Sequence, residues 1–297
     1  MSYQTIIVDS RCKLSYSNNH LIIADDEKQK DVFLDNVTAI IINTLEVSLS
    51  SYLLNEMIKR NINVIFCNER KLPSVQCLSL EGTFDTVGRL ITQINYSCDI
   101  KNKVWDKIVV DKITMQAKLM KKLNIVSKDI FANYTRKVNN GDEKNIEGIT
   151  AKMYFVRLFG PSFCRRDDNT INALLNYGYS IIASYVSREI VSMGYDTRLG
   201  IKHCSKTNTF NLTYDLIEPF RVFIDKCVYM HQHEFLTKEV KQHLISVVYE
   251  ECRYNKKKMQ LGQAMNLYIR DIFNYLDRGK NSVKELDFIW AKKVLIY

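Results

Sequence analysis

The stretch TIIVDSRCKLSYSNNHLIIA, residues 5–24, contains three short apolar or alternating segments separated by polar residues. Alternation with a period of two places successive side chains on opposite faces of a sheet, so each segment predicts a β-strand. Asn18 and Asn19 lie between the second and third segments, and Asn tolerates the positive φ of a tight hairpin turn. The predicted strands are residues 5–8, 13–16 and 21–24.

Short apolar segments bounded by polar residues continue beyond this hairpin. Residues 37–42, VTAIII, predict a buried strand, residues 48–60 predict a helix, and residues 63–66 predict a further strand. After Pro73 the apolar residues recur at the helical period instead. We therefore expect an α+β protein that begins with a small β-rich domain.

Three apolar stripes at helical spacing follow in the rest of the chain. We interpret all of them as core-facing helix surfaces, with no implication for ligands. The stripes are Ile171, Leu174, Leu175, Ile182, Tyr185 and Val186; then Leu236, Val240, Leu244, Val247 and Val248; then Leu261, Ala264, Met265, Tyr268, Ile269, Ile272, Tyr275 and Leu276. The predicted domains are a β-rich domain at residues 1–78 and a larger, all-helical domain at residues 79–297.

The charge is distributed unevenly between these two regions. The chain has a formal net charge of +9 and a pI near 9.0. Residues 1–78 hold 8 Lys and Arg against 9 Asp and Glu, whereas residues 79–297 hold 34 against 24. The basic excess therefore lies in the predicted helical domain, which we expect to face a polyanion such as DNA.

Several protein classes are disfavoured. The sequence has no segment resembling a secretory signal and no uncharged apolar run of the ~18 residues needed to span a bilayer, so we expect a cytoplasmic protein without a membrane partner. Its eight cysteines form no CxxC pair, which predicts free thiols and argues against structural zinc. Phosphate-binding glycine loops, the GxSxG elbow and the HExxH helix are also missing from the sequence.

One short region carries candidate metal ligands. His203 follows a loop-like stretch, and Asp215 and Glu218 are three residues apart, so both carboxylates would lie on one side of a helical turn. Two carboxylates and an imidazole can bind a divalent cation. An acidic pair at this spacing is also typical of a solvated helix face. Glu147, at the start of another predicted helix, is by itself explained by the helix dipole.

Taken together, these residues resemble the signatures of the CRISPR-associated integrase and endonuclease family of the adaptation module (the Cas one family). The length and the sequence pattern of the chain are similar to those of the type II branch of this family. The order and the spacing of the signatures also fit, over essentially the whole chain. The matching residues are Glu147, Ala151, Tyr154 and Phe155; then Gly200 and His203; then Tyr214 to Arg221.

The resemblance implies an enzyme of CRISPR spacer acquisition, an antiviral defence. It implies Mg²⁺ or Mn²⁺ held by Glu147, His203 and Glu218, with Asp215 beside them. The reaction would join 3′-hydroxyl ends of captured double-stranded DNA to the CRISPR repeat by transesterification. A structure-specific repair nuclease and a non-catalytic DNA-binding scaffold on the same fold are the alternatives.

The resemblance also implies the partners of such an enzyme. These are double-stranded DNA, a second copy of the chain bound through the β-rich domain, and a smaller CRISPR-associated adaptation subunit that bridges two dimers. The other type II CRISPR proteins are further candidates.

Basic residues near the signatures, or in compact runs, are candidates for phosphate contacts. For any one of them a solvated surface charge is the simpler interpretation, and Arg221 could equally form a salt bridge with Asp215 or Glu218. We expect at most half of the group to touch DNA. The group is Arg165, Arg166, Lys202, Lys206, Arg221, Lys256, Lys257 and Lys258.

Overall fold

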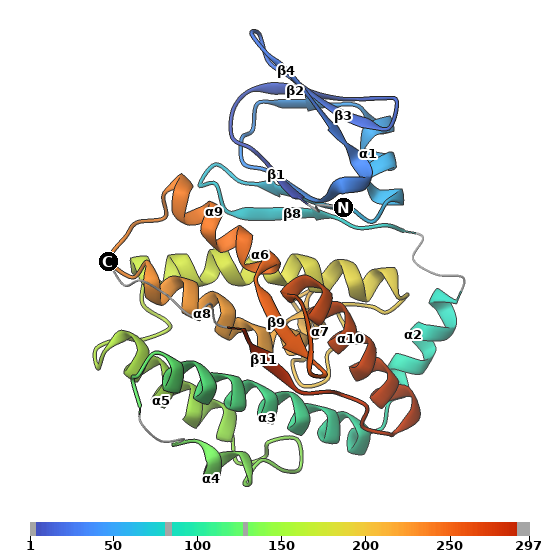
Figure 1. Cartoon of the computed structure of the whole chain (residues 1–297). Helices are drawn as coiled ribbons and strands as arrows, with labels where there is room; N and C mark the ends of the chain where they lie inside the picture. Colours follow the sequence, from blue (N-terminus) through green and yellow to red (C-terminus); the bar gives the residue numbers. More distant parts are fainter. Residues whose placement is uncertain (1–3, 81–84, 127–129, 290–297) are drawn as a thin grey trace. The chain divides into compact units, whose positions relative to one another are not determined.

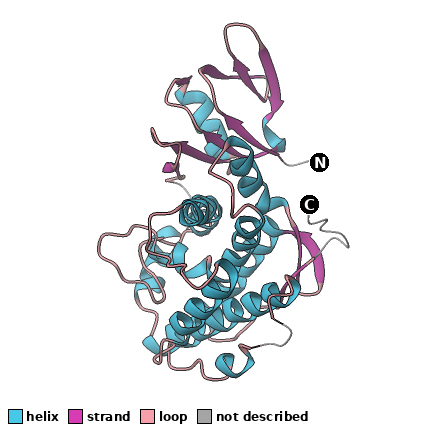
Figure 2. Cartoon of the chain, turned by 90° about the vertical axis from the view of Figure 1, so that its left-hand side faces the viewer, coloured by secondary structure: helices cyan, strands magenta, loops and turns pink. Residues whose placement is uncertain are grey.

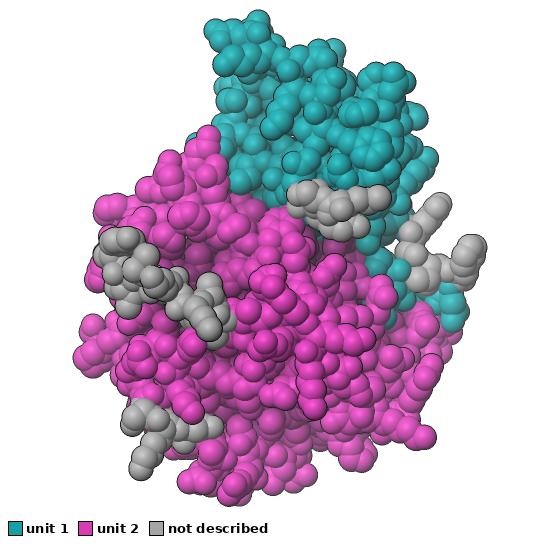
Figure 3. Space-filling model, viewed as in Figure 1, with its two compact units in different colours: residues 1–86, 191–194 teal, residues 87–190, 195–297 magenta. Residues whose placement is uncertain are grey.

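The computed structural model describes residues 4–80, 85–126 and 130–289, which form two compact units (Figure 3). Unit 1 comprises residues 1–86 and 191–194, and unit 2 comprises residues 87–190 and 195–297. Strands predominate in the N-terminal part of the chain and helices in the remainder (Figure 2). The mixed α+β class is therefore confirmed, whereas the predicted boundary after residue 78 precedes the division between the units and stays a proposal.

Residues 4–80 of unit 1 form two four-stranded sheets, the helix α1 and the 3₁₀ turn η1, Leu34–Asn36. One sheet has the order β1-β5-β7-β8, with the first three strands parallel, and the other has the order β4-β3-β2-β6. The helix is α1, Ser51–Lys59. The strands are β1 Gln4–Val8, β2 Cys12–Ser17, β3 His20–Ala24, β4 Gln29–Phe33, β5 Val37–Ile42, β6 Val47–Leu49, β7 Asn63–Cys67 and β8 Pro73–Cys77.

The hairpin predicted at Asn18 and Asn19 is confirmed, because both residues have positive φ, 44° and 65°, and β2 pairs antiparallel with β3. The predicted helix at residues 48–60 is shorter than expected. The Ser50 side chain caps its first turn by accepting a hydrogen bond from the Leu53 N–H, and Ser48 belongs to β6. Strands β4, β6 and β8 were not predicted.

Unit 2 is organised around the long helix α3, Cys98–Lys122, which packs against α5, α8, α10 and the 3₁₀ turn η2 (Figure 1). Its other helical elements are α2 Thr86–Ile94, α4 Ala132–Thr135, α5 Ile146–Phe159, α6 Thr170–Ser192, α7 Asn211–Leu216, η2 Glu218–Phe220, α8 Arg221–Met230, α9 Lys238–Ser246, η3 Val247–Tyr249 and α10 Leu261–Arg278. The three predicted stripes lie on α6, α9 with η3, and α10, except that Leu236 of the second stripe precedes α9, which begins at Lys238. In the α10 stripe every residue is buried except Tyr275, which is half-buried.

The expectation of an all-helical C-terminal domain is wrong, because β9 Glu251–Tyr254, β10 Lys257–Gln260 and β11 Leu286–Phe288 form an antiparallel sheet. Asn255 and Lys256 both have positive φ, 53° and 62°, so they form the tight turn between β9 and β10. Within β9 only Cys252 and Tyr254 are buried, too short an alternation to stand out in the sequence. None of the helices in the three described stretches is long and apolar enough to cross a membrane.

Candidate functional site

The start of α5 places Glu147. The Asp142 carboxylate accepts hydrogen bonds from the N–H groups of Ile146 (2.8 Å) and Glu147 (2.9 Å). Asn145, in the left-handed region at φ 50°, caps the helix by accepting from the Gly148 N–H. Both side chains satisfy N–H groups that the first turn of a helix leaves unpaired. These hydrogen bonds therefore hold the backbone at Glu147 in place, and the Glu147 side chain is 26% exposed.

A buried carboxylate organises the loop that carries His203. Asp215 is fully buried, and its oxygens accept hydrogen bonds from the N–H groups of Ile201 (2.6 Å), Lys202 (3.0 Å) and His203 (3.2 Å). Gly200 is required here, because a Cβ would lie 2.2 Å from the His203 carbonyl oxygen and 2.9 Å from Asp215 Oδ2.

The same carboxylate also orients the imidazole. His203 Nδ1 lies 2.5 Å from Asp215 Oδ1, and because a carboxylate only accepts, Nδ1 must carry the proton. This hydrogen bond raises the pKa of the His203 imidazole. The charges of Glu218 and Glu147 raise it further, and burial opposes the rise. Trp105 packs edge-on against the ring, at 6.0 Å between centroids.

Glu218 lies where one helix stops and another starts. Helix α7 ends at Leu216, residues 218–220 form the turn η2 with Pro219 near its start, and α8 begins at Arg221. Glu218 is only 5% exposed, and its Oε1 lies 3.0 Å from Arg221 Nη2. The salt bridge between Arg221 and Glu218, one of the two roles considered for this arginine, is therefore confirmed.

Lys112, from the middle of α3, joins the two glutamates. Its Nζ donates to Glu147 Oε1 at 2.5 Å and lies 2.6 Å from Glu218 Oε2, and its side chain is 9% exposed. Burial opposes ionisation of Lys112, yet the charges of Glu218 and Glu147 raise its pKa. Burial likewise opposes ionisation of Glu218, and the Arg221 and Lys112 charges lower its pKa. The site therefore holds two carboxylates and two cations in close contact.

A second buried carboxylate supports this group. The hydroxyls of Tyr154 (2.9 Å) and Tyr179 donate to Asp225, and burial raises the pKa of Asp225 to about 6. The Arg221 guanidinium lies 4.6 Å from the centre of the Tyr179 ring. This chain of contacts links Tyr154, part of the first signature, to the arginine that ends the third.

The sequence analysis missed Lys112 and Asp225. Lys112 had a detectable signal, because it lies at helical spacing with the buried residues Trp105, Ile108 and Val109 and so interrupts an apolar face of α3. A lysine in such a position is rarely buried without a partner of opposite charge. Asp225 offered no comparable signal, since an acidic residue on a short helix is common.

The basic candidates are in different environments. Arg165 donates to Asn172 (2.5 Å) and Asn176 (2.8 Å) and lies over the Tyr179 ring, and Lys202 Nζ donates to the Gly141 carbonyl (2.7 Å). The remaining candidates other than Arg221 are exposed, and among them Lys258 forms an ion pair with Glu251 at 2.6 Å. The exposed candidates are Arg166, Lys206, Lys256, Lys257 and Lys258. Which of them touch DNA stays a prediction.

The donor set suits Mg²⁺ or Mn²⁺, since hard carboxylate oxygens bind both ions and one imidazole is tolerated best by Mn²⁺. Across residues 4–80, 85–126 and 130–289, no group of three or more His, Cys, Asp and Glu side chains is arranged to hold a metal ion. At Glu147 and Glu218 an ammonium lies between the carboxylates instead. The residue types therefore fit a divalent ion, but in the present arrangement the Lys112 ammonium contacts both carboxylates.

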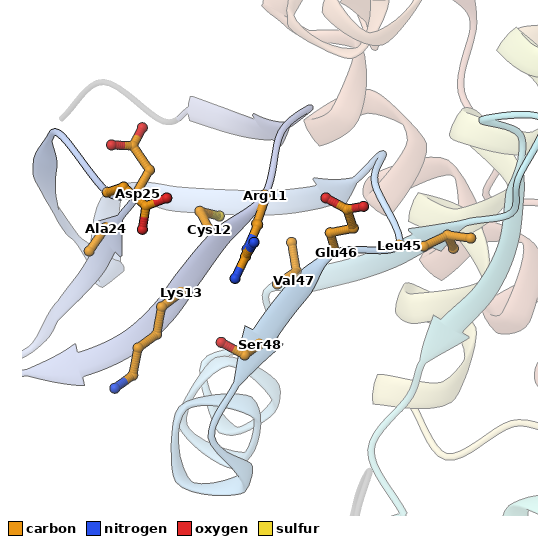
Figure 4. Close-up of a pocket in the computed structure, with 10 residues that line it drawn as sticks. Arg11, Cys12, Lys13, Ala24, Asp25, Leu45, Glu46, Val47 and Ser48 are labelled. Atoms are coloured by element: carbon orange, nitrogen blue, oxygen red, sulfur yellow. The ribbon is translucent and has the colours of Figure 1, made fainter.

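Unit 1 has a pocket of its own, about 610 Å³ in volume (Figure 4). None of its lining residues belongs to the signatures. They are Arg11, Cys12, Lys13, Ala24, Asp25, Asp26, Leu45, Glu46, Val47 and Ser48.

Comparison with known proteins adds independent information. The family model described as CRISPR associated protein Cas1 matches residues 5–248. The CRISPR-associated endonuclease Cas1 of Neisseria meningitidis serogroup C (strain 8013) is 32% identical over 264 residues, which cover 86% of each chain.

Solved structures show the same fold. A casposase bound to integration product has a TM-score of 0.78 at 18% identity, covering 95% of this chain and 92% of that one. A chain of a Cas6-RT-Cas1–Cas2 complex has a TM-score of 0.70 at 17% identity, covering 98% of this chain and 36% of that one. At such identities the likeness shows the fold alone.

Proposed function

Because this chain belongs to the Cas1 family of CRISPR-associated proteins, we propose that it is a metal-dependent integrase and endonuclease of spacer acquisition. It joins the 3′-hydroxyl ends of captured double-stranded DNA to the CRISPR repeat by transesterification. The observation that carries the proposal is the contact of Glu147 and Glu218 with one ammonium, that of Lys112, together with a histidine whose ring is oriented by Asp215.

In this proposal Glu147, Glu218 and His203 hold Mg²⁺ or Mn²⁺. Asp215 keeps the proton on His203 Nδ1, which leaves Nε2 as the nitrogen that can bind an ion. A divalent ion held there would supply activation of the attacking hydroxyl and would offset the charge that develops on the phosphoryl oxygens. No side chain has to act as a covalent nucleophile, because the DNA 3′-hydroxyl would attack the phosphodiester directly and displace a 3′-oxygen of the repeat. No nucleotide is needed either, because one phosphodiester is exchanged for another.

The basic residues of the C-terminal region would bind the DNA through its phosphates. Residues 79–297 hold the basic excess of the chain, and Arg166, Lys206 and Lys257 are exposed. Contacts to phosphates position a duplex without reading its sequence. Arg221 and Arg165 instead serve mainly to brace the site, since both guanidinium groups are already bonded within the protein.

The proposed assembly is a homodimer formed through residues 1–78, with a smaller adaptation subunit bridging two dimers. The Cas1–Cas2 complex among the structural relatives supports such a partner. Domain roles and partner identity rest on the family membership and not on contacts in this chain.

The test is a joining assay with a short 3′-hydroxyl duplex and a supercoiled plasmid, in Mn²⁺, Mg²⁺ or EDTA, with and without the adaptation subunit. Glu218→Gln should abolish joining and leave DNA binding equal or stronger, because a negative charge near the phosphates is lost. Glu239→Gln, at an exposed position on α9, is the matched control and should join normally. Full activity of Glu218→Gln, or activity in EDTA, would disprove the assigned site.

A further inference from the structure

Lys112 contacts both Glu147 and Glu218 and so connects the two glutamates into one site. Its ammonium contacts Glu147 Oε1 at 2.5 Å and Glu218 Oε2 at 2.6 Å. The other oxygen of Glu218 is engaged by Arg221 at 3.0 Å. Each oxygen of Glu218 therefore already has a cation beside it, although Glu218 is one of the proposed metal ligands.

We propose that Lys112 is a resident cation, which holds the two carboxylates together before a metal binds and which a divalent ion must displace. This inference rests on the proposed function, because it concerns the same ligands. The ammonium and the ion would share two carboxylates and repel each other at short range, so binding of one opposes binding of the other. Lys112 thereby sets the metal affinity of the site.

Lys112, and not Arg221, is the cation able to give way. Arg221 is braced on two sides, by Glu218 and by the ring of Tyr179, whose hydroxyl is itself held by Asp225. A guanidinium that lies over an aromatic ring and also pairs with a carboxylate has contacts on two sides that oppose its movement. The ammonium of Lys112 sits at the end of a four-carbon stem with rotatable bonds, so it can withdraw while the helix stays in place.

The charges explain why a resident cation is useful. Glu147 and Glu218 both approach one ammonium at a largely buried site, and two negative charges placed so close together repel each other. The ammonium contacts both carboxylates and offsets this repulsion while no metal is bound. The site is therefore assembled in advance, at the cost of weaker metal binding.

The experiment measures Mn²⁺ binding to the full-length chain by the electron paramagnetic resonance signal of free Mn²⁺, and thermal unfolding in EDTA. Lys112→Met should bind Mn²⁺ at least about tenfold more tightly, because the competing charge is gone. Its unfolding temperature in EDTA should fall, and Mn²⁺ should raise it by more than in the wild type. Lys107→Met is the matched control, because Lys107 lies on the same helix but pairs with Asp111.

An unchanged or weaker Mn²⁺ affinity in Lys112→Met would overturn the inference. So would a loss of joining at unchanged Mn²⁺ affinity, which would assign Lys112 to the DNA. If Lys112→Met does not fold, Lys112→Arg serves instead, because it keeps the positive charge. Lys112→Arg should bind Mn²⁺ no more tightly than the wild type. Tighter Mn²⁺ binding by Lys112→Arg would refute the competition between the side chain and the metal.

Glu218→Gln separates this inference from the proposed function. If that variant binds Mn²⁺ as well as the wild type does, the proposed metal site itself is wrong. If Glu218→Gln loses binding while Lys112→Met binds as the wild type does, only the role of Lys112 is wrong.

Discussion

Replacing Asp215 by Asn tests how the His203 loop is held. One oxygen of Asp215 accepts from the N–H groups of Ile201 and Lys202, and the other accepts from the N–H and ring Nδ1 of His203. Asparagine offers a single oxygen and an NH₂ group that only donates. Whichever way the amide turns, at least one backbone N–H of the loop would face another donor.

The size of the effect follows from this arrangement. Asp215 is fully buried whereas the His203 side chain is 46% exposed, so the main loss is that of a buried backbone donor left without an acceptor, which costs about 1–3 kcal/mol. We expect Asp215→Asn to lower the free energy of unfolding in EDTA by that amount, measured by urea denaturation. Below its unfolding transition the variant should still join DNA, about 10–100-fold more slowly, because His203 remains present but is poorly oriented.

Asp196→Asn is a suitable control. Asp196 also accepts a backbone N–H, that of Arg198 at 2.8 Å, and pairs with the Arg198 guanidinium, which is 69% exposed. Loss of such an exposed pair should cost no more than about 1 kcal/mol. If Asp215→Asn unfolded like this control and joined at the wild-type rate, Asp215 would not organise the loop. Joining as low as in Glu218→Gln would instead make Asp215 a direct metal ligand.

Two further predictions concern pH and salt. The pKa of Asp225 in the folded protein is about 6, above its ordinary value of 3.8. The folded state therefore keeps this proton to a higher pH than the unfolded state does. The resulting contribution to the free energy of unfolding is present below about pH 4 and is lost as the pH rises from about 4 to about 6. Asp225→Asn should remove that dependence from urea-unfolding curves, and a curve parallel to that of the wild type would contradict the assignment. DNA binding by the full chain should weaken steeply with salt, and Lys206→Ala should reduce the slope of log K against log salt by about 1. An unchanged slope would show that Lys206 contacts no phosphate.

The parts of unit 1 that were predictable are those with strong local patterns. Residues 37–42 are almost wholly apolar and form β5 within the predicted bounds, because a strand between two parallel neighbours is buried on both faces. The polar strand β4 buries only Val32 and leaves no such pattern. Strand β8 begins at Pro73, which a strand tolerates as its first residue but which reads as a break in a sequence.

The candidate site was predictable only as far as its signatures extend. Glu147, His203, Asp215 and Glu218 all enter the contact network of unit 2, but which carboxylate meets which partner depends on tertiary packing. Lys112 lies 35 residues from Glu147 in the sequence and on a different helix, so no local spacing connects them. The β9–β10 hairpin was missed for the opposite reason, because its lysines looked like a basic patch and concealed a short strand.

The break at Pro219 separates the tasks of the two carboxylates in the third signature. On an uninterrupted α-helix, residues three apart would lie on the same side, and Asp215 and Glu218 would compete for the same neighbours. Instead α7 ends at Leu216 and a 3₁₀ turn follows, so Asp215 reaches the His203 loop while Glu218 reaches α3 and α8. One short segment thus supplies both a carboxylate that orients the histidine and a carboxylate available to a cation. The proline accordingly contributes to the chemistry through backbone geometry, although it carries no functional group.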